Sequence, residues 1–475
     1  MNIILSRRRN RKEYDVIVIG TGGGTKLGTP CTKLGLKVAL IEKGPIGGTC
    51  LNRGCIPSKM LIHPADVAVH IQEASKFDIH NNPEFTVDFA KLTTRISNTV
   101  DKDSQSIRPN YDKNELLDFY PYEGKFVSNK VIEVNGEQIT AEKIFIAVGG
   151  RPLIPDWPGL EGTPYMTSTE ALRNTKQPKS MIVVGGGYIA CELGHAYGGL
   201  GTDVHFLVRS RMIRREDPDI VDEFEKEFSK RYNVYLGAIP TQVSYENNEF
   251  TVTYSQDGSE KEIKAEALLV AIGTTPNSDT LNLESTDINV KSNGFIEVDD
   301  HLRTSVPGIW ALGDVVGNYQ FRHSVNFEGE HLFETIFLNE KEAPIEYPPM
   351  PHAVFTHPQV AKVGKTEQDL IDAGKQAGVD YVVGLNTYSS SAMGMARLSD
   401  HGFVKVIIDV SSRKLIGAHV IGDEASNLIN TFIYAMTTGG TIDDLLKMIY
   451  IHPALPEIAR NACRKARAAL NKVAV

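Results

Sequence analysis

The feature that most constrains the fold of this chain is a glycine-rich turn that follows a short apolar stretch at two places. Residues 14–20 are rich in β-branched side chains and run into a glycine cluster at residues 20–24. Residues 180–185 form a second apolar stretch, which runs into three glycines at residues 185–187. Both patterns predict a buried parallel strand, a tight turn and a helix. Because they recur about 165 residues apart, we expect two dinucleotide-binding domains in an α/β chain.

Further apolar stretches complete the two predicted units. Residues 38–42 and 203–208 are the expected second strands, and residues 144–152 and 268–276 are strands that close each unit. Hairpin-like strands precede the closing strands, as around Asp257-Gly258.

The last quarter of the chain has a different pattern. A proline-rich stretch at residues 347–351 predicts a linker, and strands at 403–409 and 414–421 with helices at 424–437 and 456–470 predict an α+β domain. The expected organisation is an arm at 1–13, a first dinucleotide domain at 14–155 and 277–345, a second at 156–276, and the α+β domain at 346–475.

Composition limits the functions open to the chain. Its 475 residues are 41% hydrophobic, with a formal net charge of −9. This acidic balance disfavours nucleic acid as a partner, and no apolar run approaches the ~18 residues that suggest a membrane span. We expect the basic cluster at residues 7–12 to be a disordered arm rather than a targeting signal. Five cysteines are too few for a secreted disulfide scaffold, which favours a reducing, cytoplasmic location.

Two cysteines stand five residues apart, in Gly47-Gly-Thr-Cys50-Leu-Asn-Arg-Gly-Cys55-Ile-Pro-Ser-Lys59. On a regular helix, α-carbons at i and i+5 lie roughly 8–9 Å apart, beyond the ~7 Å limit for a disulfide. Pairing therefore needs distorted backbone, which Gly48 and Gly54 can supply. A pair of plain buried thiols is the alternative. No metal site is expected, because no further cysteine or histidine ligands lie nearby at matching spacing.

This motif is similar to the signature of the flavoprotein disulfide reductases, a family that includes dihydrolipoyl dehydrogenase, glutathione reductase, mycothione reductase and mercuric reductase. The resemblance extends from about residue 14 to residue 468. It implies two Rossmann-like dinucleotide-binding domains, for FAD and NAD(P), and a C-terminal α+β dimerisation domain. It also implies that Cys50 attacks the substrate disulfide, that Cys55 is the thiol nearest the flavin, and that Lys59 lies near flavin atom N5.

The first glycine turn is the expected FAD site. Glycines let the backbone approach a pyrophosphate, and Glu42 at the end of the next strand can accept hydrogen bonds from a ribose. Thr25 replaces the third glycine, and Pro30 lies in the expected helix, which predicts a kink or a late start. Gly313-Asp314 and residues 323–329 resemble later flavin motifs of the family. The residues assigned to FAD are Gly20, Gly22, Gly24, Glu42, Lys43, Gly48, Thr49, Lys59, Gly149, Gly313 and Asp314.

The second glycine turn is the expected nicotinamide dinucleotide site. By resemblance, Tyr188 is the ring that covers the flavin until the nicotinamide arrives, and Glu192 pairs with Lys59. No acidic residue ends the strand at 203–208, and four arginines follow whose forked donors suit a 2′-phosphate. We therefore expect NADPH rather than NADH; a merely solvated basic face is the alternative. The assigned residues are Gly185, Gly187, Tyr188, Ala190, Arg209, Arg211, Arg214, Arg215 and Gly273, and Cys191 is expected to be a core thiol.

A histidine near the C-terminus completes the candidate residues. His452 precedes Glu457 by five positions, and a carboxylate can hold an imidazole in one tautomer for acid–base work. Thiol–disulfide exchange needs such a group at the leaving thiol. The resemblance implies that this pair serves the cysteines of a partner in a homodimer.

These residues predict an enzyme that passes electrons between a nicotinamide, FAD, a Cys50–Cys55 disulfide and a small or carrier-bound dithiol or disulfide. Residues 323–329 resemble dihydrolipoyl dehydrogenases, whereas the altered glycine loop, residues 417–426 and residues 451–457 resemble mycothione reductases, which favour NADPH. The prediction is a dihydrolipoyl dehydrogenase-like enzyme, with an NADPH-dependent reductase of the mycothione type as the alternative. The alternative outside the enzymes is a non-catalytic, flavin-free dimer with a structural or redox-sensing role.

Overall fold

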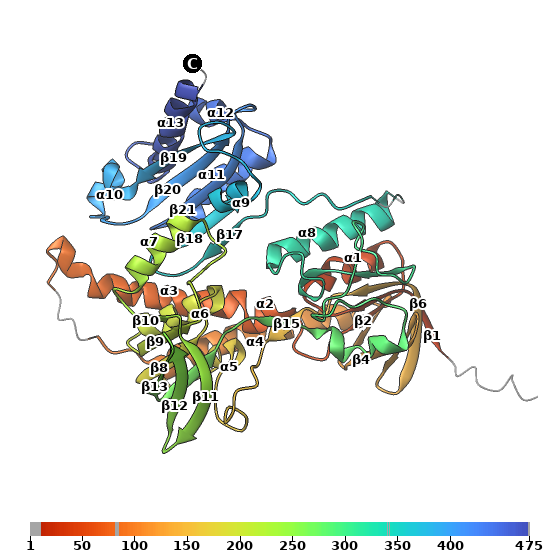
Figure 1. Ribbon diagram of the computed structural model, residues 1–475. Coiled ribbons are helices and arrows are strands. Elements are labelled where there is room, and N and C mark those ends of the chain that lie inside the picture. Colours follow the sequence, from red (N-terminus) through yellow and green to blue (C-terminus); the bar gives the residue numbers. More distant parts are fainter. Residues whose placement is uncertain (1–10, 81–84, 340, 342, 474–475) are drawn as a thin grey trace, which may run out of the picture. The chain divides into compact units, whose positions relative to one another are not determined.

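The computed structural model describes residues 11–80, 85–339, 341 and 343–473 (Figure 1). The chain divides into two compact units. Unit 1 comprises residues 1–58, 93–153 and 273–346, and unit 2 comprises residues 59–92, 154–272 and 347–475. The expected linker at 347–351 coincides with a boundary between the units, and it carries no regular secondary structure until β17 (His352–Val354) begins.

Unit 1 is built on a mixed seven-stranded sheet with the strand order β3-β2-β1-β6-β5-β4, and β16 also pairs with β6. The parallel part places β1 between β2 and β6, with Val16 opposite Val38 and Ile17 opposite Ile144. These strands are apolar on both faces because both faces are buried. The bounds are β1 Lys12–Ile19, β2 Val38–Ile41, β3 Leu117–Tyr120, β4 Gly124–Ser128, β5 Val131–Val134, β6 Glu137–Ile146 and β16 Ile309–Ala311.

The first strand begins earlier than the sequence pattern indicates. Most of the expected arm, residues 1–10, lies outside the described residues. Lys12 is already part of β1, because it pairs with Ile139 of β6. Its ammonium also lies 2.7 Å from the Asp118 carboxylate of β3 and 5.4 Å from the centre of the Tyr14 ring. The ordered fold therefore includes the last residues assigned to the arm.

Unit 2 contains a four-stranded parallel sheet in the order β10-β9-β8-β14. Its predicted strands match the structure closely: β8 is Ser180–Val184 and β9 is Asp203–Val208. β14 is Ala267–Val270 and β10 is Asn233–Leu236. A separate antiparallel sheet consists of β11 Ile239–Glu246, β12 Glu249–Gln256 and β13 Ser259–Ala265, which contain the predicted hairpin.

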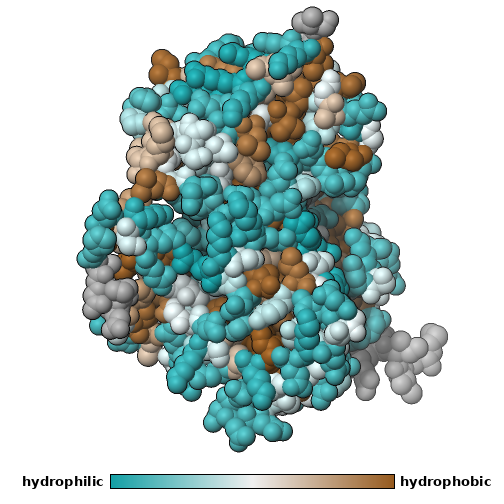
Figure 2. Space-filling model, turned by 60° about the vertical axis from the view of Figure 1, so that its left-hand side comes forward, coloured by the Kyte–Doolittle hydropathy of each residue, from teal (hydrophilic) through white to brown (hydrophobic). Residues whose placement is uncertain are grey.

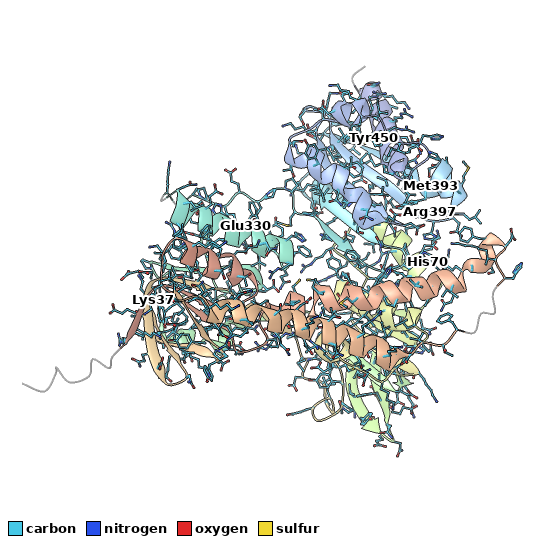
Figure 3. All side chains as sticks on the ribbon, turned by 180° about the vertical axis from the view of Figure 1, so that it is seen from behind. Lys37, His70, Glu330, Met393, Arg397 and Tyr450 are labelled. Atoms are coloured by element: carbon cyan, nitrogen blue, oxygen red, sulfur yellow. The ribbon has the colours of Figure 1, made fainter. Side chains whose placement is uncertain are left out.

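The last part of unit 2 is the expected α+β element. Its five-stranded antiparallel sheet has the order β17-β18-β21-β20-β19. Two helices supply apolar faces to its core, α11 Ala425–Thr437 and α13 Pro456–Val473. Arg397, labelled in Figure 3, follows the short helix α10 and donates to the carboxylate of Glu424, the residue before α11. The strand bounds are β17 His352–Val354, β18 Val360–Gly364, β19 Tyr381–Thr387, β20 Phe403–Asp409 and β21 Leu415–Ile421.

The remaining helices lie between the strands. The bounds are α1 Gly28–Lys33, α2 Gly48–Arg53, α3 Cys55–Gln72, α4 Phe89–Asp112, α5 Ser168–Ala171, α6 Tyr188–Gly199, α7 Pro218–Phe228, α8 Arg322–Phe333, α9 Glu367–Asp372, α10 Ala392–Ala396 and α12 Ile442–Lys447. Among the described residues, no helix is both long and apolar enough to cross a membrane. On the face shown in Figure 2, apolar side chains occur in separate groups among hydrophilic ones.

Candidate functional site

The two motif cysteines lie on two different helices. Cys50 is in α2 and Cys55 opens α3, with Gly54 between the helices at φ −142° and ψ −119°. A Cβ atom on Gly54 would lie 2.9 Å from the Thr49 carbonyl oxygen and 3.3 Å from the Cys50 α-carbon. Gly54 therefore permits a close approach of the chain to Cys50 that no other residue would allow. This is the distorted backbone that pairing across five residues requires.

A buried amide fixes the segment that leads into α2. The side chain of Asn52 donates to the carbonyl oxygens of Pro45, Ile46 and Gly48 at 3.0–3.2 Å. Ser104 of α4 donates to the Ile46 carbonyl oxygen at 2.7 Å. These bonds hold the start of α2, and with it Cys50, against the body of unit 1.

The other cysteines do not resemble redox thiols. Cys31, Cys191 and Cys463 are all buried. Burial raises the pKa of Cys31 and of Cys463 to about 12 and raises that of Cys191 as well. Such thiols stay protonated at neutral pH and are poor nucleophiles. The expectation that Cys191 is a core thiol is confirmed.

The first glycine turn is tightly packed. Gly20 has φ +103°, and a Cβ there would lie 2.3 Å from the Ala147 carbonyl oxygen. The helix that follows starts late: a 3-10 turn at Gly23–Lys26 precedes α1, and Pro30 is the third residue of α1, where its missing N–H costs no helix bond. The Thr25 hydroxyl, in place of the third glycine, donates to the Gly22 carbonyl oxygen at 2.9 Å.

The residues around this turn fit FAD. The Glu42 carboxylate accepts from the Thr21 amide and hydroxyl at 2.9 and 2.8 Å and from the Gly44 amide at 2.9 Å, so it stands at the mouth of the turn. Burial raises the pKa of Asp314, and among the described residues no hydrogen bond to its carboxylate is found. A half-buried carboxylate without such a hydrogen bond can accept from the hydroxyls of a sugar or ribityl chain.

A buried carboxylate within the predicted motif at residues 323–329 supports the Asp314 turn. Glu328 of α8 accepts a hydrogen bond from the Gly313 amide at 2.6 Å. Val325, one turn earlier, fills the space where a Cβ on Gly23 would lie, at 2.2 Å. Helix α8 thus contacts both the first glycine turn and the Gly313-Asp314 turn, the two predicted flavin motifs of unit 1.

Lys59 and Glu192 form the ion pair that the resemblance implies. Their side-chain nitrogen and oxygen lie 2.5 Å apart, and the Phe355 amide donates to the other Glu192 oxygen at 3.0 Å. The Lys59 ammonium also lies 4.4 Å from the centre of the Phe355 ring. Burial raises the pKa of Glu192, and the charge of Lys59 opposes that rise. Lys59 is the first residue of unit 2, whereas both motif cysteines belong to unit 1.

The second glycine turn opens α6 in the way the sequence predicts. Gly185 has φ +133°, and Gly187 caps α6 without a side-chain hydrogen bond. A Cβ on Gly187 would meet no atom within 4 Å, so the backbone N–H groups at the start of this twelve-residue helix lie open to an anion. Ala190 is fully buried in the first turn of α6.

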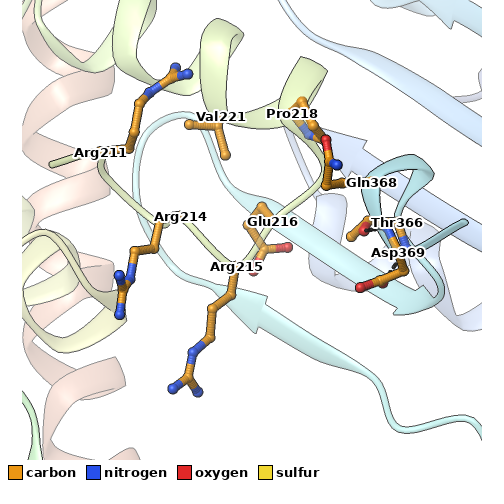
Figure 4. A pocket seen from close by; sticks show the side chains of 9 residues that line it. All are labelled: Arg211, Arg214, Arg215, Glu216, Pro218, Val221, Thr366, Gln368 and Asp369. Carbon is orange, nitrogen blue, oxygen red and sulfur yellow. Dashed lines mark hydrogen bonds between the residues drawn. The ribbon is translucent and has the colours of Figure 1, made fainter. Parts of the chain in front are cut away.

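The four arginines are not equivalent. Arg211 donates to Glu225 at 2.6–3.1 Å and to Asp222 at 2.6 Å, so two carboxylates of α7 compensate its charge. Arg209, Arg214 and Arg215 are exposed. Figure 4 shows Arg211 extending in the opposite direction from Arg214 and Arg215. The last two are therefore better placed than Arg211 to offer uncompensated charge to a phosphate.

The arginine loop also borders a pocket of about 340 Å³ (Figure 4). The pocket is lined by Arg211, Arg214, Arg215, Glu216, Pro218, Val221, Thr366, Gln368 and Asp369. Its lining mixes basic and acidic side chains, so it does not favour an anion as strongly as the arginines alone would suggest.

His452 and Glu457 are paired. The histidine Nδ1 lies 3.0 and 3.1 Å from the two carboxylate oxygens, and Arg460 donates to the same carboxylate at 2.9 Å. Burial raises the pKa of Glu457, but the bonds from His452 and Ala454 and the charge of Arg460 lower it overall. The Arg460 guanidinium lies 5.8 Å from the ring of Tyr450, labelled in Figure 3. The side chain of His452 is 70% exposed and that of Glu457 only 6%.

The predicted residues thus fall into two groups, one in each unit. The cysteines and the FAD residues other than Lys59 are in unit 1, and Lys59, Glu192, the second glycine turn, the arginines and His452 are in unit 2. Gly273 was assigned to the second dinucleotide site but belongs to unit 1, where its carbonyl oxygen accepts from the Leu153 amide at 3.0 Å. The sequence reasoning missed Glu216 and His352, which contact Tyr188; an acidic residue directly after four arginines was the only signal.

Comparisons with known proteins agree with this geometry. Residues 14–329 match the family model described as pyridine nucleotide-disulphide oxidoreductase, and residues 350–463 match its dimerisation domain. The chain is 34% identical over 472 residues to a dihydrolipoyl dehydrogenase of Geobacillus stearothermophilus, covering 96% of both chains. It is 33% identical to a mycothione reductase of Mycobacterium tuberculosis, covering 94% of this chain and 98% of the relative.

A solved structure shows the same fold. The HOCl-induced flavoprotein disulfide reductase RclA from Escherichia coli superimposes with a TM-score of 0.83 at 27% identity, over 94% of this chain and 98% of that one. The α/β architecture with two dinucleotide-binding domains and a C-terminal dimerisation domain is therefore confirmed. The chain belongs to the pyridine nucleotide-disulphide oxidoreductases, the family of class I flavoprotein disulfide reductases that use FAD.

Proposed function

We propose that this chain transfers two electrons between NADPH and a dithiol or disulfide substrate through Cys50 and Cys55. The observation that carries the proposal is the break between α2 and α3 at Gly54, which lets the chain approach Cys50 closely from the start of α3. The domain limits proposed for this work are 14–155 with 277–345 for FAD, 156–276 for the nicotinamide dinucleotide and 346–475 for dimerisation. Its location is proposed to be the cytoplasm.

FAD, when bound by the residues around Gly20, Glu42 and Asp314, supplies electron transfer between the dinucleotide and the cysteine pair. In the reductive direction, the Cys50 thiolate attacks one sulfur of the substrate disulfide, whose S–S bond breaks as a mixed disulfide forms. The departing thiolate takes a proton from the His452 of the second copy in the proposed homodimer. The Cys55 thiolate then attacks the Cys50 sulfur, which breaks the mixed disulfide, releases the second half of the substrate as a thiolate and leaves a Cys50–Cys55 disulfide.

The hydrogen bond with Glu457 determines which ring nitrogen of His452 is left for proton exchange. Glu457 accepts from Nδ1, which leaves Nε2 to exchange a proton with a thiol. His452 follows Ile449 and Ile451, which are 99% and 79% exposed. Large apolar side chains so exposed favour burial against another surface. We propose that they lie in a homodimer interface and that His452 serves the cysteines of the second copy.

We propose two candidate substrate classes. The first candidate is a dihydrolipoyl-type dithiol, free or on a carrier, as in the dihydrolipoyl dehydrogenase relative. The second is a low-molecular-weight disulfide of the mycothione type. The exposed Arg214 and Arg215 favour the second, because uncompensated guanidinium groups suit the 2′-phosphate of NADPH.

An anaerobic titration of the purified protein with NADPH, and separately with NADH, tests this function. We expect the flavin absorbance to fall and a long-wavelength charge-transfer band to appear at a lower concentration of NADPH than of NADH. Appearance of the band with NADH first would move the assignment to lipoamide and NAD. Flavin bleaching without such a band would mean that the cysteines are not coupled to the flavin, which contradicts the proposal.

A further inference from the structure

Three polar side chains from distant parts of the sequence meet at the start of α6. The Tyr188 hydroxyl donates to Glu216 Oε1, and His352 Nε2 lies 2.7 Å from the same oxygen. The Tyr188 hydroxyl and His352 Nε2 are 2.9 Å apart, and their rings are 5.1 Å apart between centroids. Glu216 follows the arginine loop, and His352 begins β17. We call these three residues the tyrosine anchor.

Glu216, the carboxylate of the tyrosine anchor, is buried although one of its oxygens lacks a hydrogen bond within the described residues. Glu216 is only 4% exposed, and its second oxygen, Oε2, has no hydrogen-bond partner in the part of the chain that the structure describes. Burial raises the pKa of Glu216, but the bond and charge of His352, the charge of Lys362 and the bond from Tyr188 lower it overall. Burying a carboxylate with one oxygen unpaired costs free energy that simple core packing would avoid. The cost points to a role for the residue beyond filling space.

The anchor connects the two segments that form the second dinucleotide turn. The Ile213 amide donates to the Gly186 carbonyl oxygen at 2.6 Å, and a Cβ on Gly186 would lie 3.2 Å from the Arg211 carbonyl oxygen. The arginine loop therefore lies directly on the glycine turn. Ile213 has φ +37°, a strained conformation for a buried β-branched residue, and such strain gathers where function requires a fixed loop.

Two residues on one face of α6, Tyr188 and Glu192, each contact the segment that begins at His352. Tyr188 and Glu192 are four residues apart and so lie one above the other on the helix. His352 contacts the first, and the Phe355 amide donates to the second at 3.0 Å. The segment from His352 to Phe355 thus runs along the face of α6 that begins at the glycine turn and fixes the direction of both side chains.

We propose that Glu216 and His352 are positioning residues for the nicotinamide dinucleotide and that they act through the Tyr188 hydroxyl. This inference rests on the proposed function of the second glycine turn. Tyr188 is the first residue of α6, directly after Gly187, so its ring borders the place where the backbone N–H groups meet the ligand. The two hydrogen bonds of the hydroxyl limit the directions that the ring samples, so less conformational entropy is lost when the ring is ordered beside the dinucleotide.

The test is a double-mutant cycle on the FAD-loaded protein. The variants are Tyr188→Phe, which removes only the hydroxyl, Glu216→Gln, and the two combined. The measured quantities are the dissociation constant of NADPH, by titration of the intact protein, and the KM values for NADPH and for a disulfide. Tyr197→Phe is the matched control, since it lies on the same helix and its hydroxyl donates to the Ala171 carbonyl oxygen instead.

We expect each single variant to weaken NADPH binding by about three- to tenfold and the double variant to be no weaker than either. The KM for the disulfide and the binding by Tyr197→Phe should not change. Unchanged or tighter NADPH binding by Tyr188→Phe would overturn the inference. Fully additive losses would do the same, because Glu216 would then act independently of the hydroxyl.

Failure of the proposed function would look different. In that case the unsubstituted protein itself would neither bind NADPH or NADH nor show flavin reduction. If Glu216→Gln loses FAD or unfolds at a lower temperature, the NADPH affinity of Tyr188→Phe alone tests the inference. Replacing the hydroxyl by hydrogen leaves the ring and its packing in place. A normal flavin spectrum with weakened NADPH binding supports the inference, and a normal spectrum with unchanged binding overturns it.

Discussion

The ammonium of Lys405 lies 2.7 Å from the carboxylate of Asp217, and neither side chain is more than 1% exposed. Asp219 and Glu367 also contact Lys405, each at 2.7 Å. Lys405 belongs to β20, Asp217 caps α7, and Glu367 opens α9, so one buried cation joins three elements of unit 2. The hydrogen bonds of the three carboxylates outweigh burial and raise the pKa of Lys405.

Replacement of this lysine should destabilise the protein strongly. Lys405→Met leaves the Asp217 carboxylate buried without its cation, and removal of one partner from a buried pair costs about 3–5 kcal/mol. The measurement is the urea concentration at half-unfolding of unit 2 in the FAD-loaded protein. Lys447→Met is the control, because Lys447 pairs with Asp444 at the surface, where such pairs contribute about 0–1 kcal/mol. Equal midpoints for the two variants would contradict the prediction.

Acid should weaken the fold through Glu73. Burial raises its pKa, but the hydrogen bond and charge of His357, with Lys76 and Arg231, outweigh burial and hold the pKa at about 2. Because the folded pKa lies below the unfolded value of about 4.3, its contribution is complete above that value and is lost as the pH falls toward 2. We expect Glu73→Gln to flatten the fall in melting temperature between about pH 4.5 and 2.5. An unchanged slope would show that other carboxylates dominate.

Cys50 should be essential for disulfide turnover. Cys50→Ser replaces the attacking thiolate by a hydroxyl that stays protonated, and we expect a loss on the order of a thousandfold or more. Cys463→Ser is the control: Cys463 is buried, its pKa is raised to about 12, and its loss should leave turnover within about twofold. The assay is steady-state disulfide reduction with NADPH. Normal turnover by Cys50→Ser would exclude the proposed exchange.

The arginine loop should decide between NADPH and NADH. Replacing Arg214 and Arg215 by glutamine removes two exposed guanidinium groups, and we expect NADPH to bind about tenfold or more weakly while NADH binding stays constant. Arg211→Gln should leave the ratio of the two affinities unchanged, because Glu225 and Asp222 already compensate its charge. A larger effect from Arg211 than from Arg214 and Arg215 would reverse this assignment.

His452 should affect the thiol exchange and not the reduction of the flavin. We expect His452→Gln to slow disulfide turnover by about 10²–10⁴ while anaerobic flavin reduction by NADPH keeps its rate. Glu457→Gln should slow the same step less, because it weakens only the hydrogen bond to His452 Nδ1 and leaves the imidazole in place. His401→Gln serves as the control, since His401 also lies beside a carboxylate, Asp400 at 2.8 Å. Slowed flavin reduction in His452→Gln would contradict the assigned role.

Local sequence patterns predicted the limits of an element well where the residues of the element and the flanking turn residues both indicate them. The strand at 203–208 agrees with β9 at both ends, and the strand at 403–409 agrees with β20, because most side chains of each stretch are apolar and are buried. The late start of α1 also followed from Pro30. The start of β1 did not, since Lys12 joins the strand by pairing with Ile139 of β6, more than 100 residues away.

The sequence by itself determined the family, the cysteine pair, the two glycine turns and the buried strands, because each is a property of neighbouring residues. Only the tertiary structure decided that Arg211 is compensated by α7, that Lys405 gathers three carboxylates, and that Tyr188 meets Glu216 and His352. Hydrogen bonds and ion pairs act over about 3 Å, so residues 136 positions apart, as Glu216 and His352 are, can interact only after folding brings them together.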